Sequence, residues 1–141
     1  MKHSYLYQLL LGESSGRCSA LIVAVGMMIG LLPKENLLVA FLVLLLVLLP
    51  GRLILGIASI VGFTFLSLLL DPMADRIGAR LLDNSAIQAL GSTLYTLPLG
   101  AWTMLNNTVV VGQLMIGGVL FFPVYFLSSK IVKTFSARGT G

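Results

Sequence analysis

The chain has 141 residues, 57% of them hydrophobic and 10% charged, with a mean hydropathy of +1.01 and a formal net charge of +4. A soluble domain of this length needs a charged outer surface, and nine basic and five acidic residues are too few to make one. The composition therefore predicts an integral membrane protein of a single domain, with no room for a separate soluble catalytic domain. The basic residues are dispersed and form no block with interleaved aromatics, which argues against nucleic acid as a partner.

The residue types of common catalytic and metal sites are scarce in this sequence. His3 is the only histidine and Cys18 the only cysteine, so His-based triads, zinc sites and an intrachain disulfide lack their parts. The sequence has no Gly-rich phosphate loop, and its five acidic residues do not have metal-ligand spacing. We therefore expect a protein that is not an enzyme and that uses no metal and no cofactor.

The two ends of the chain are predicted to lie at the membrane surface. Residues 1–17 contain only a short apolar stretch, in which Tyr5 and Tyr7 suit the level of the lipid headgroups, so we expect an interfacial segment. Residues 128–141 form a basic tail. The face that carries both ends also carries Arg52 and most of the other basic residues, and the positive-inside bias assigns this richer face to the cytoplasm.

The first two apolar runs are short for a membrane crossing. They cover 18–33 and 37–49, whereas a bilayer core takes about 20 helical residues. Residues 34–36 separate them directly after Pro33, so 18–49 is expected to fold as a helical hairpin. The hairpin either crosses a thinned bilayer or re-enters from one side. We favour the re-entrant form, in which protein must cover the tip.

The third apolar run, 53–70, is long enough to be a transmembrane helix. Asp71 and Pro72 then suit the cap and the first position of a new helix. Apolar residues recur every four positions from Met73 onward, among charged ones. This pattern predicts a separate amphipathic helix over 71–83 that lies in the interface.

The remaining apolar sequence, 86–127, is expected to form a second hairpin. Its first run, 86–105, is polar for a lipid-exposed span and contains Pro98, so we expect it to re-enter. Its second run, 108–127, is expected to be a transmembrane helix. The predicted fold class is therefore all-α: a polytopic helical membrane protein with short hairpins, re-entrant or crossing, and an interfacial amphipathic helix.

Polar side chains at the turns and beside the apolar runs are the candidates for binding a lipid or another ligand. An amide at a turn either satisfies freed backbone groups or holds a headgroup. An arginine at a helix end either snorkels to the interface or faces an anionic group. The candidates are Asn36, Arg52, Asn106, Asn107 and Gln113.

Small residues four positions apart predict close contacts between helices. The pairs are Gly26 with Gly30, and Ala58 with Gly62. We interpret both pairs as ordinary packing within the chain, while self-association through Gly26 and Gly30 is the alternative.

Three stretches carry a family resemblance: GMMIGLLPKENLL at 26–38, LDP at 70–72 and NNTVVVG at 106–112. Together they resemble a family of small bacterial inner-membrane proteins related to a polytopic domain of unknown function. Where such proteins continue into an Arg-x-Asn-like segment, this chain has Pro50-Gly51-Arg52, so no role of that asparagine is transferred. The resemblance implies a bacterial inner-membrane location and a large partner, an AsmA-like protein with a membrane anchor and a long periplasmic body associated with lipid movement.

The leading hypothesis is therefore a non-enzymatic accessory subunit of an AsmA-like phospholipid-transport system, with membrane lipids and the AsmA-like protein as partners. One alternative is a permeation protein for small solutes or ions, suggested by two hairpins with asparagines at their turns. Another is a structural scaffold or chaperone that stabilises a transmembrane helix of a partner.

Overall fold

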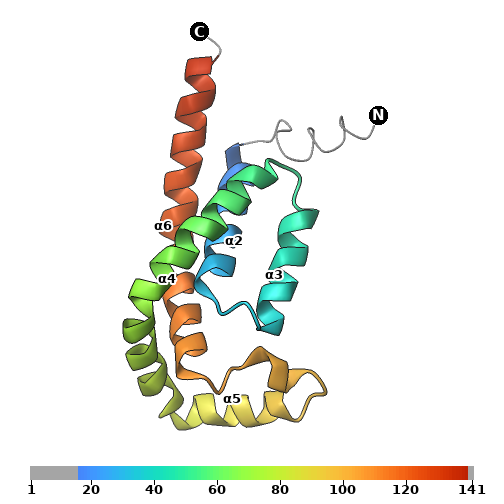
Figure 1. Ribbon diagram of the computed structural model, residues 1–141, viewed down its shortest axis with the longest axis vertical. Helices are drawn as coiled ribbons and strands as arrows, with labels where there is room; N and C mark the ends of the chain where they lie inside the picture. Colours follow the sequence, from blue (N-terminus) through green and yellow to red (C-terminus); the bar gives the residue numbers. More distant parts are fainter. Residues whose placement is uncertain (1–15, 140–141) are drawn as a thin grey trace.

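The computed structural model describes residues 16–139, and every regular element within them is helical (Figure 1). In chain order the elements are α2 (Gly16–Leu31), α3 (Leu37–Leu48), α4 (Leu53–Leu82), α5 (Ser85–Tyr95), the 3₁₀ helix η1 (Gly100–Thr103) and α6 (Thr108–Gly139). The all-α class is confirmed. The predicted interfacial segment lies outside the described residues except for its last two, which begin α2.

The core of the molecule is built around α2, which contacts α3, α4 and α6. Most residues of α2 are buried, and Ile22 and Met27 are completely inaccessible. By contrast, α3 buries only Val39 and Leu46, so it packs on α2 at the edge of the bundle. Figure 1 shows α4 and α6 running side by side, with α3 on the other side of α2.

Glycines let α2 and α4 approach backbone to backbone. A Cβ atom on Gly26 would lie 2.8 Å from the carbonyl oxygen of Gly56, and one on Gly30 would lie 2.8 Å from that of Ile60. No larger residue fits at either glycine without moving the helices apart. The Ser59 hydroxyl also donates a hydrogen bond of 2.7 Å to the carbonyl oxygen of Val23 across this contact. Gly26 and Gly30 therefore serve packing within the chain.

The prediction that Ala58 and Gly62 are packing residues is wrong for this bundle. Ala58 is exposed, and a Cβ atom on Gly62 would meet nothing within 4 Å. The reason is helix geometry, because the face of α4 that contacts α2 carries Gly56, Ser59 and Phe63, at spacings of three and four residues. Ala58 and Gly62 lie on the opposite, outward face.

The expected boundary at Asp71 and Pro72 does not exist, because α4 is one helix that contains Pro72. Proline lacks the N–H that would bond to the carbonyl of Leu68, so the helix loses one hydrogen bond there. Tertiary packing keeps the chain helical beyond it. A Cβ atom on Gly78 would clash with the Thr108 backbone at the start of α6. The separate amphipathic helix over 71–83 is thus the second half of α4, which curves in Figure 1.

The predicted second hairpin over 86–127 is also wrong as an arrangement, although both of its helical parts exist. Helix α5 ends at Tyr95, before Pro98, and η1 follows. Figure 1 shows α5 lying across the end of the bundle, beyond the start of α6. α5 contacts α4 and η1, and η1 contacts α3. This segment therefore closes one end of the bundle and does not run along α6.

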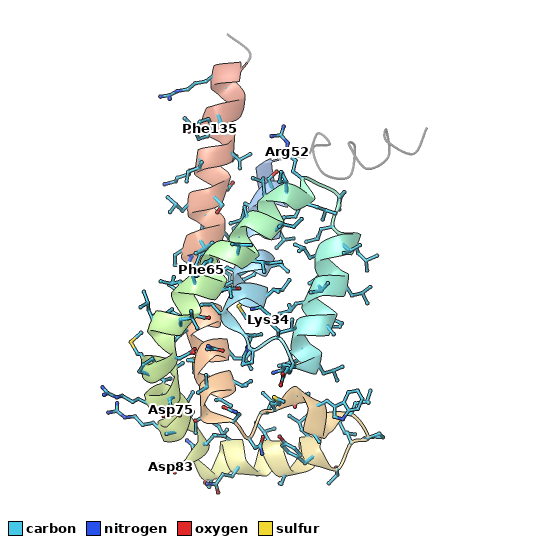
Figure 2. All side chains as sticks on the ribbon, in the orientation of Figure 1. Lys34, Arg52, Phe65, Asp75, Asp83 and Phe135 are labelled. Carbon is cyan, nitrogen blue, oxygen red and sulfur yellow. The ribbon has the colours of Figure 1, made fainter. Side chains whose placement is uncertain are left out.

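Within residues 16–139, two helices are long and apolar enough to cross a membrane, namely α4 and α6. α2 and α3 are shorter apolar helices. The outward faces of α3, α4 and α6 carry exposed large apolar side chains, among them Phe41, Leu69 and Phe122. Figure 2 shows Phe65 and Phe135 at the outside of α4 and α6.

The glycine contact predicts a steric response to a single methyl group. Gly26→Ala or Gly30→Ala should destabilise the folded protein by about 1–3 kcal/mol, the usual cost of overpacking. Gly62→Ala is the matched control in an exposed helix interior, and it should be neutral or stabilise by up to about 1 kcal/mol through helix propensity. Unfolding of the purified variants in detergent, followed by circular dichroism, measures the difference. Equal stability of Gly26→Ala and Gly62→Ala would contradict the packing.

Candidate functional site

A polar cavity of about 240 Å³ lies where the tip of the α2–α3 hairpin meets α4 and α6. Its polar lining residues are Lys34, Thr64, Ser67, Asp71 and Gln113. The rest of the lining is apolar and includes Leu68 and Val109. A cavity with one acid, one base, an amide and two hydroxyls on an otherwise apolar wall suits the polar end of an amphiphile.

Asp71 and Gln113 link α4 to α6 at this cavity. The Gln113 side-chain amide donates a hydrogen bond of 2.5 Å to one carboxylate oxygen of Asp71. Gln113 is only 3% exposed, and its Oε1 atom is buried with no hydrogen-bond partner among the described residues. Because an ionised carboxylate only accepts hydrogen bonds, the amide nitrogen must face Asp71, which leaves Oε1 in need of a donor.

The two hydroxyls of the cavity have used their protons elsewhere. Thr64 donates to the carbonyl oxygen of Ile60 and Ser67 to that of Thr64, both at 2.7 Å. What each hydroxyl can still offer is an oxygen lone pair. Together with Asp71 and Gln113, these oxygens make one wall of the cavity rich in acceptors.

Lys34 holds the tip of the hairpin in place at the rim of the cavity. Its Nζ atom donates to the carbonyl oxygens of Ile29, Gly30 and Leu32 at 2.9, 3.0 and 3.1 Å. A cation is favourable here because the last carbonyls of a helix carry partial negative charge. Partial burial lowers the pKa of Lys34 from its usual value by desolvation.

A second contact between α4 and α6 lies one turn further along α4. The Thr108 hydroxyl, at the start of α6, donates a short hydrogen bond to the Asp75 carboxylate. Asp71 and Asp75 therefore both face α6. The expectation that Asp71 caps a new helix did not include this contact with α6.

Three predicted candidates act as helix caps or turn contacts. Asn36 is buried and accepts a hydrogen bond of 2.9 Å from the backbone N–H of Leu38, which caps α3. Asn107 is exposed and accepts one of 2.9 Å from the N–H of Val109 at the start of α6. Asn106 is exposed, and its Oδ1 atom accepts a hydrogen bond of 2.6 Å from the Tyr95 hydroxyl. Each amide oxygen thus has a local structural partner.

Arg52 does not belong to the cavity. It is exposed at the residue before α4, and Figure 2 shows it at one end of the bundle, whereas Asp75 and Asp83 lie toward the other end. The structure therefore does not bring the five predicted candidates together. Gln113 is the only one of them that lines the polar cavity.

Sequence reasoning missed four of the polar cavity residues as ligand contacts, and a signal for one of them was available. Asp71 ends an uncharged stretch from Leu53 to Leu70, and an acid at the edge of a membrane span is a functional candidate. Thr64 and Ser67 gave no such signal, because hydroxyl residues are common in membrane helices. Lys34 was read as a turn residue, which it also is.

A larger cavity of about 370 Å³ lies between the start of α2 and α6, near the end of the bundle that carries Arg52. It is lined by Arg17 together with aromatic residues such as Phe121 and Tyr125. Its lining includes no buried unpartnered polar atom among those identified in the described residues. Within the same residues, no group of three or more His, Cys, Asp or Glu side chains is placed to hold a metal ion.

Comparisons with known proteins do not assign this site, because the chain matches no protein-family model, no curated protein and no solved structure.

The contact between Asp71 and Gln113 makes a thermodynamic prediction. Gln113→Leu should lower the free energy of unfolding by about 1–3 kcal/mol, since it removes the donor from a partly buried carboxylate. Adding Asp71→Leu should recover part of this loss, because no unpaired polar group then remains. A double-mutant cycle in detergent, read by chemical unfolding, gives the coupling energy. Gln88→Leu on the exposed face of α5 is the matched control and should have a smaller effect. Additive effects of the Asp71 and Gln113 changes would show that the two side chains are not coupled.

Proposed function

We propose that the protein is a non-enzymatic, lipid-handling accessory subunit of a bacterial inner membrane, and that the cavity beside Asp71 and Gln113 receives a lipid headgroup. The observation that carries this proposal is the cavity itself. It lies beside two membrane-length helices and is lined by two ionisable side chains, two hydroxyls and Gln113, whose amide oxygen is buried without a partner among the described residues. In a membrane setting such groups are costly, which makes them a functional candidate.

The exposed surface supports a lipid environment around the bundle. Leu69 of α4 is 78% exposed and Leu48 of α3 is 71% exposed, and other large apolar side chains such as Phe41 and Phe65 are exposed on the same helices. Soluble proteins rarely expose contiguous apolar surface of this kind. Lipid tails around α3, α4 and α6 would cover it, and a headgroup could then reach the cavity from the side.

The depth of the hairpin favours a crossing over a re-entrant loop, which reverses our preference from the sequence. Lys34 at the tip and Asp71 on α4 line the same cavity. Asp71 also ends the uncharged stretch of α4 that begins at Leu53. The tip therefore reaches the level at which charges resume on a membrane-length helix. At a rise of 1.5 Å per residue α2 extends about 24 Å, which suits a locally thinned bilayer.

The arrangement of basic residues supports a cytoplasmic location for the end of the bundle at which α2 starts and α6 ends. Figure 1 shows the start of α2 and the end of α6 on the same side. Arg17, Arg52, Lys130 and Lys133 lie in the segments at that end. The positive-inside bias favours placing such a face in the cytoplasm. The polar cavity would then lie near the opposite, periplasmic interface of the inner membrane.

The family resemblance supports a partner on the periplasmic side, a large AsmA-like protein with its own membrane anchor. The outward face of α4 offers a place for that anchor, because Ala58 and Gly62 lie there without packing against the bundle. Small residues let another helix approach closely. In this arrangement the scaffold hypothesis becomes part of the same function, since the partner's anchor would dock beside the lipid-binding cavity.

The permeation hypothesis loses its main support. It rested on asparagines at two hairpin tips facing a common path. Asn36 is a buried helix cap, whereas Asn106 and Asn107 are exposed in the turn before α6. Their positions are explained by helix capping and by the contact with Tyr95.

Filling the cavity tests the proposal directly. Leu68→Trp places a bulky side chain in the cavity wall and should abolish the lipid that stays bound through purification in a mild detergent. Leu69→Trp is the matched control, because Leu69 is exposed to a similar extent as Leu68, 78% against 65%, but does not line the cavity. Native mass spectrometry counts the retained lipids in each variant. Equal retention in Leu68→Trp and Leu69→Trp would place the lipid elsewhere.

Arg52 gives a second control with the opposite expectation. Since Arg52 lies far from the cavity, Arg52→Ala should keep the bound lipid and change the membrane orientation or cellular abundance instead, while Arg52→Lys should behave as the unaltered protein. Loss of the bound lipid in Arg52→Ala at normal abundance would move the binding site to the end of the bundle where α4 begins.

The partner is tested by affinity purification from native membranes, in several mild detergents, with identification of co-purified proteins by mass spectrometry. We expect a large AsmA-like protein, and we expect Gly62→Leu to reduce its amount while the bound lipid is kept, because Gly62 faces outward. Gly91→Leu on α5 is the control for a bulky residue at another open glycine. Absence of the AsmA-like protein in every detergent would refute the partner and leave the lipid site untouched.

A further inference from the structure

We infer that the headgroup received by this cavity carries a primary ammonium, as in an ethanolamine phospholipid. The inference rests on the proposed function and specifies its ligand. It differs from the sequence-based alternatives in which Arg52 faces an anionic group and the turn asparagines hold a headgroup, because these side chains do not line the cavity.

The side-chain oxygen of Gln113 needs a hydrogen-bond donor. The Oε1 atom of Gln113 is buried and unpartnered, and its amide nitrogen is already bonded to Asp71. Thr64 and Ser67 have donated their protons to backbone carbonyls. Lys34 also lines the cavity, but its Nζ atom already donates to three backbone carbonyls. The remaining polar side chains of the wall offer acceptors, and a ligand that donates several hydrogen bonds satisfies them.

The charge of the Asp71 carboxylate also favours a cationic ligand. Asp71 is partly buried, and its partner among the described residues is the neutral amide of Gln113. A carboxylate in a low-dielectric position is stabilised by a cation and destabilised by a second anion. An ammonium supplies both the positive charge and the hydrogen-bond donors.

Hydrogen-bond donors and net charge distinguish an ethanolamine headgroup from choline and glycerol headgroups. A quaternary ammonium has no N–H, so it would leave Gln113 Oε1 unsatisfied. A glycerol headgroup donates through hydroxyls but brings a net negative charge next to Asp71. In an ethanolamine phospholipid the phosphate lies one short linker away from the ammonium, and Lys34 provides a positive charge on the same cavity.

An inorganic monovalent cation shares part of this chemistry, since carboxylate, amide and hydroxyl oxygens also bind hard cations. The apolar part of the lining favours the lipid, because Leu68 and Val109 line the cavity together with the acceptors. The test must therefore separate a lipid ammonium from a free cation.

The experiment compares three dioleoyl phospholipids, with ethanolamine, choline and glycerol headgroups, titrated into delipidated protein and measured by native mass spectrometry. We expect the ethanolamine lipid to bind at least about tenfold more tightly than either of the others. Asp71→Asn and Gln113→Leu should each remove this preference. Asp83→Asn makes the same chemical change at an exposed position after the end of α4, and it should keep the preference.

A parallel arm measures the thermal unfolding of lipid-free protein in sodium chloride and in choline chloride. Stabilisation by sodium that is lost in Asp71→Asn, without any preference for the ethanolamine lipid, would overturn the inference in favour of a free cation. Equal binding of the ethanolamine and choline lipids, or preference for the glycerol lipid, would also overturn it while leaving lipid handling intact. If Leu68→Trp left the binding of all three lipids unchanged, the proposed function itself would be refuted.

Discussion

The close approach of α2, α4 and α6 is the constraint on which the rest of this structure depends. Two of these helices are long and apolar enough to cross a membrane. In a bilayer, apolar side chains would gain little by leaving lipid for protein, and helices would associate through tight packing and interhelical hydrogen bonds. Both are present here. Gly26 and Gly30 allow backbone contact with α4, and the Ser59 hydroxyl bonds to the carbonyl of Val23 across the same interface. The central helix can therefore be short and still be the most buried element of the bundle.

The same packing fixes the positions of the polar groups. Gly112 of α6 lies so close to the backbone of Ala74 that a side chain on it would clash, and this contact holds α4 against α6 beyond Pro72. Gln113 is the next residue of α6, and its side chain reaches Asp71, three residues before Ala74. The hydrogen bond between Asp71 and Gln113 is thus a consequence of the close contact between Gly112 and Ala74 beside it. The helix past Pro72 and the pairing of Asp71 with Gln113 have one cause.

The sequence predicted features that depend on composition and on local turns. Helical class, the hairpin turn at residues 34–36 and the role of Gly26 and Gly30 all follow from such signals. The sequence could not predict which face of α4 packs against α2, because an apolar helix has no polar face to orient it. The spacing of small residues therefore indicates Ala58 and Gly62, whereas the contact is made by Gly56 and Ser59. Asp71 and Pro72 gave a strong local signal for a helix start, which tertiary packing overrode. The cavity depends on residues up to 82 positions apart in the chain, from Leu31 to Gln113, so no local pattern reveals it.

The length of α2 explains why a cavity exists at this level. α2 ends at Leu31, and the chain turns back at Lys34, whereas α4 and α6 continue past the tip. A longer central helix would cover Asp71 and Gln113 with apolar side chains, and an acid in that position would then lack both water and a counter-charge. The shorter helix leaves the pair at the wall of an open cavity, with Lys34 at its rim. Because α2 ends at Leu31, it is short for an ordinary membrane span, and the same early end leaves room for a polar ligand beside two membrane-length helices.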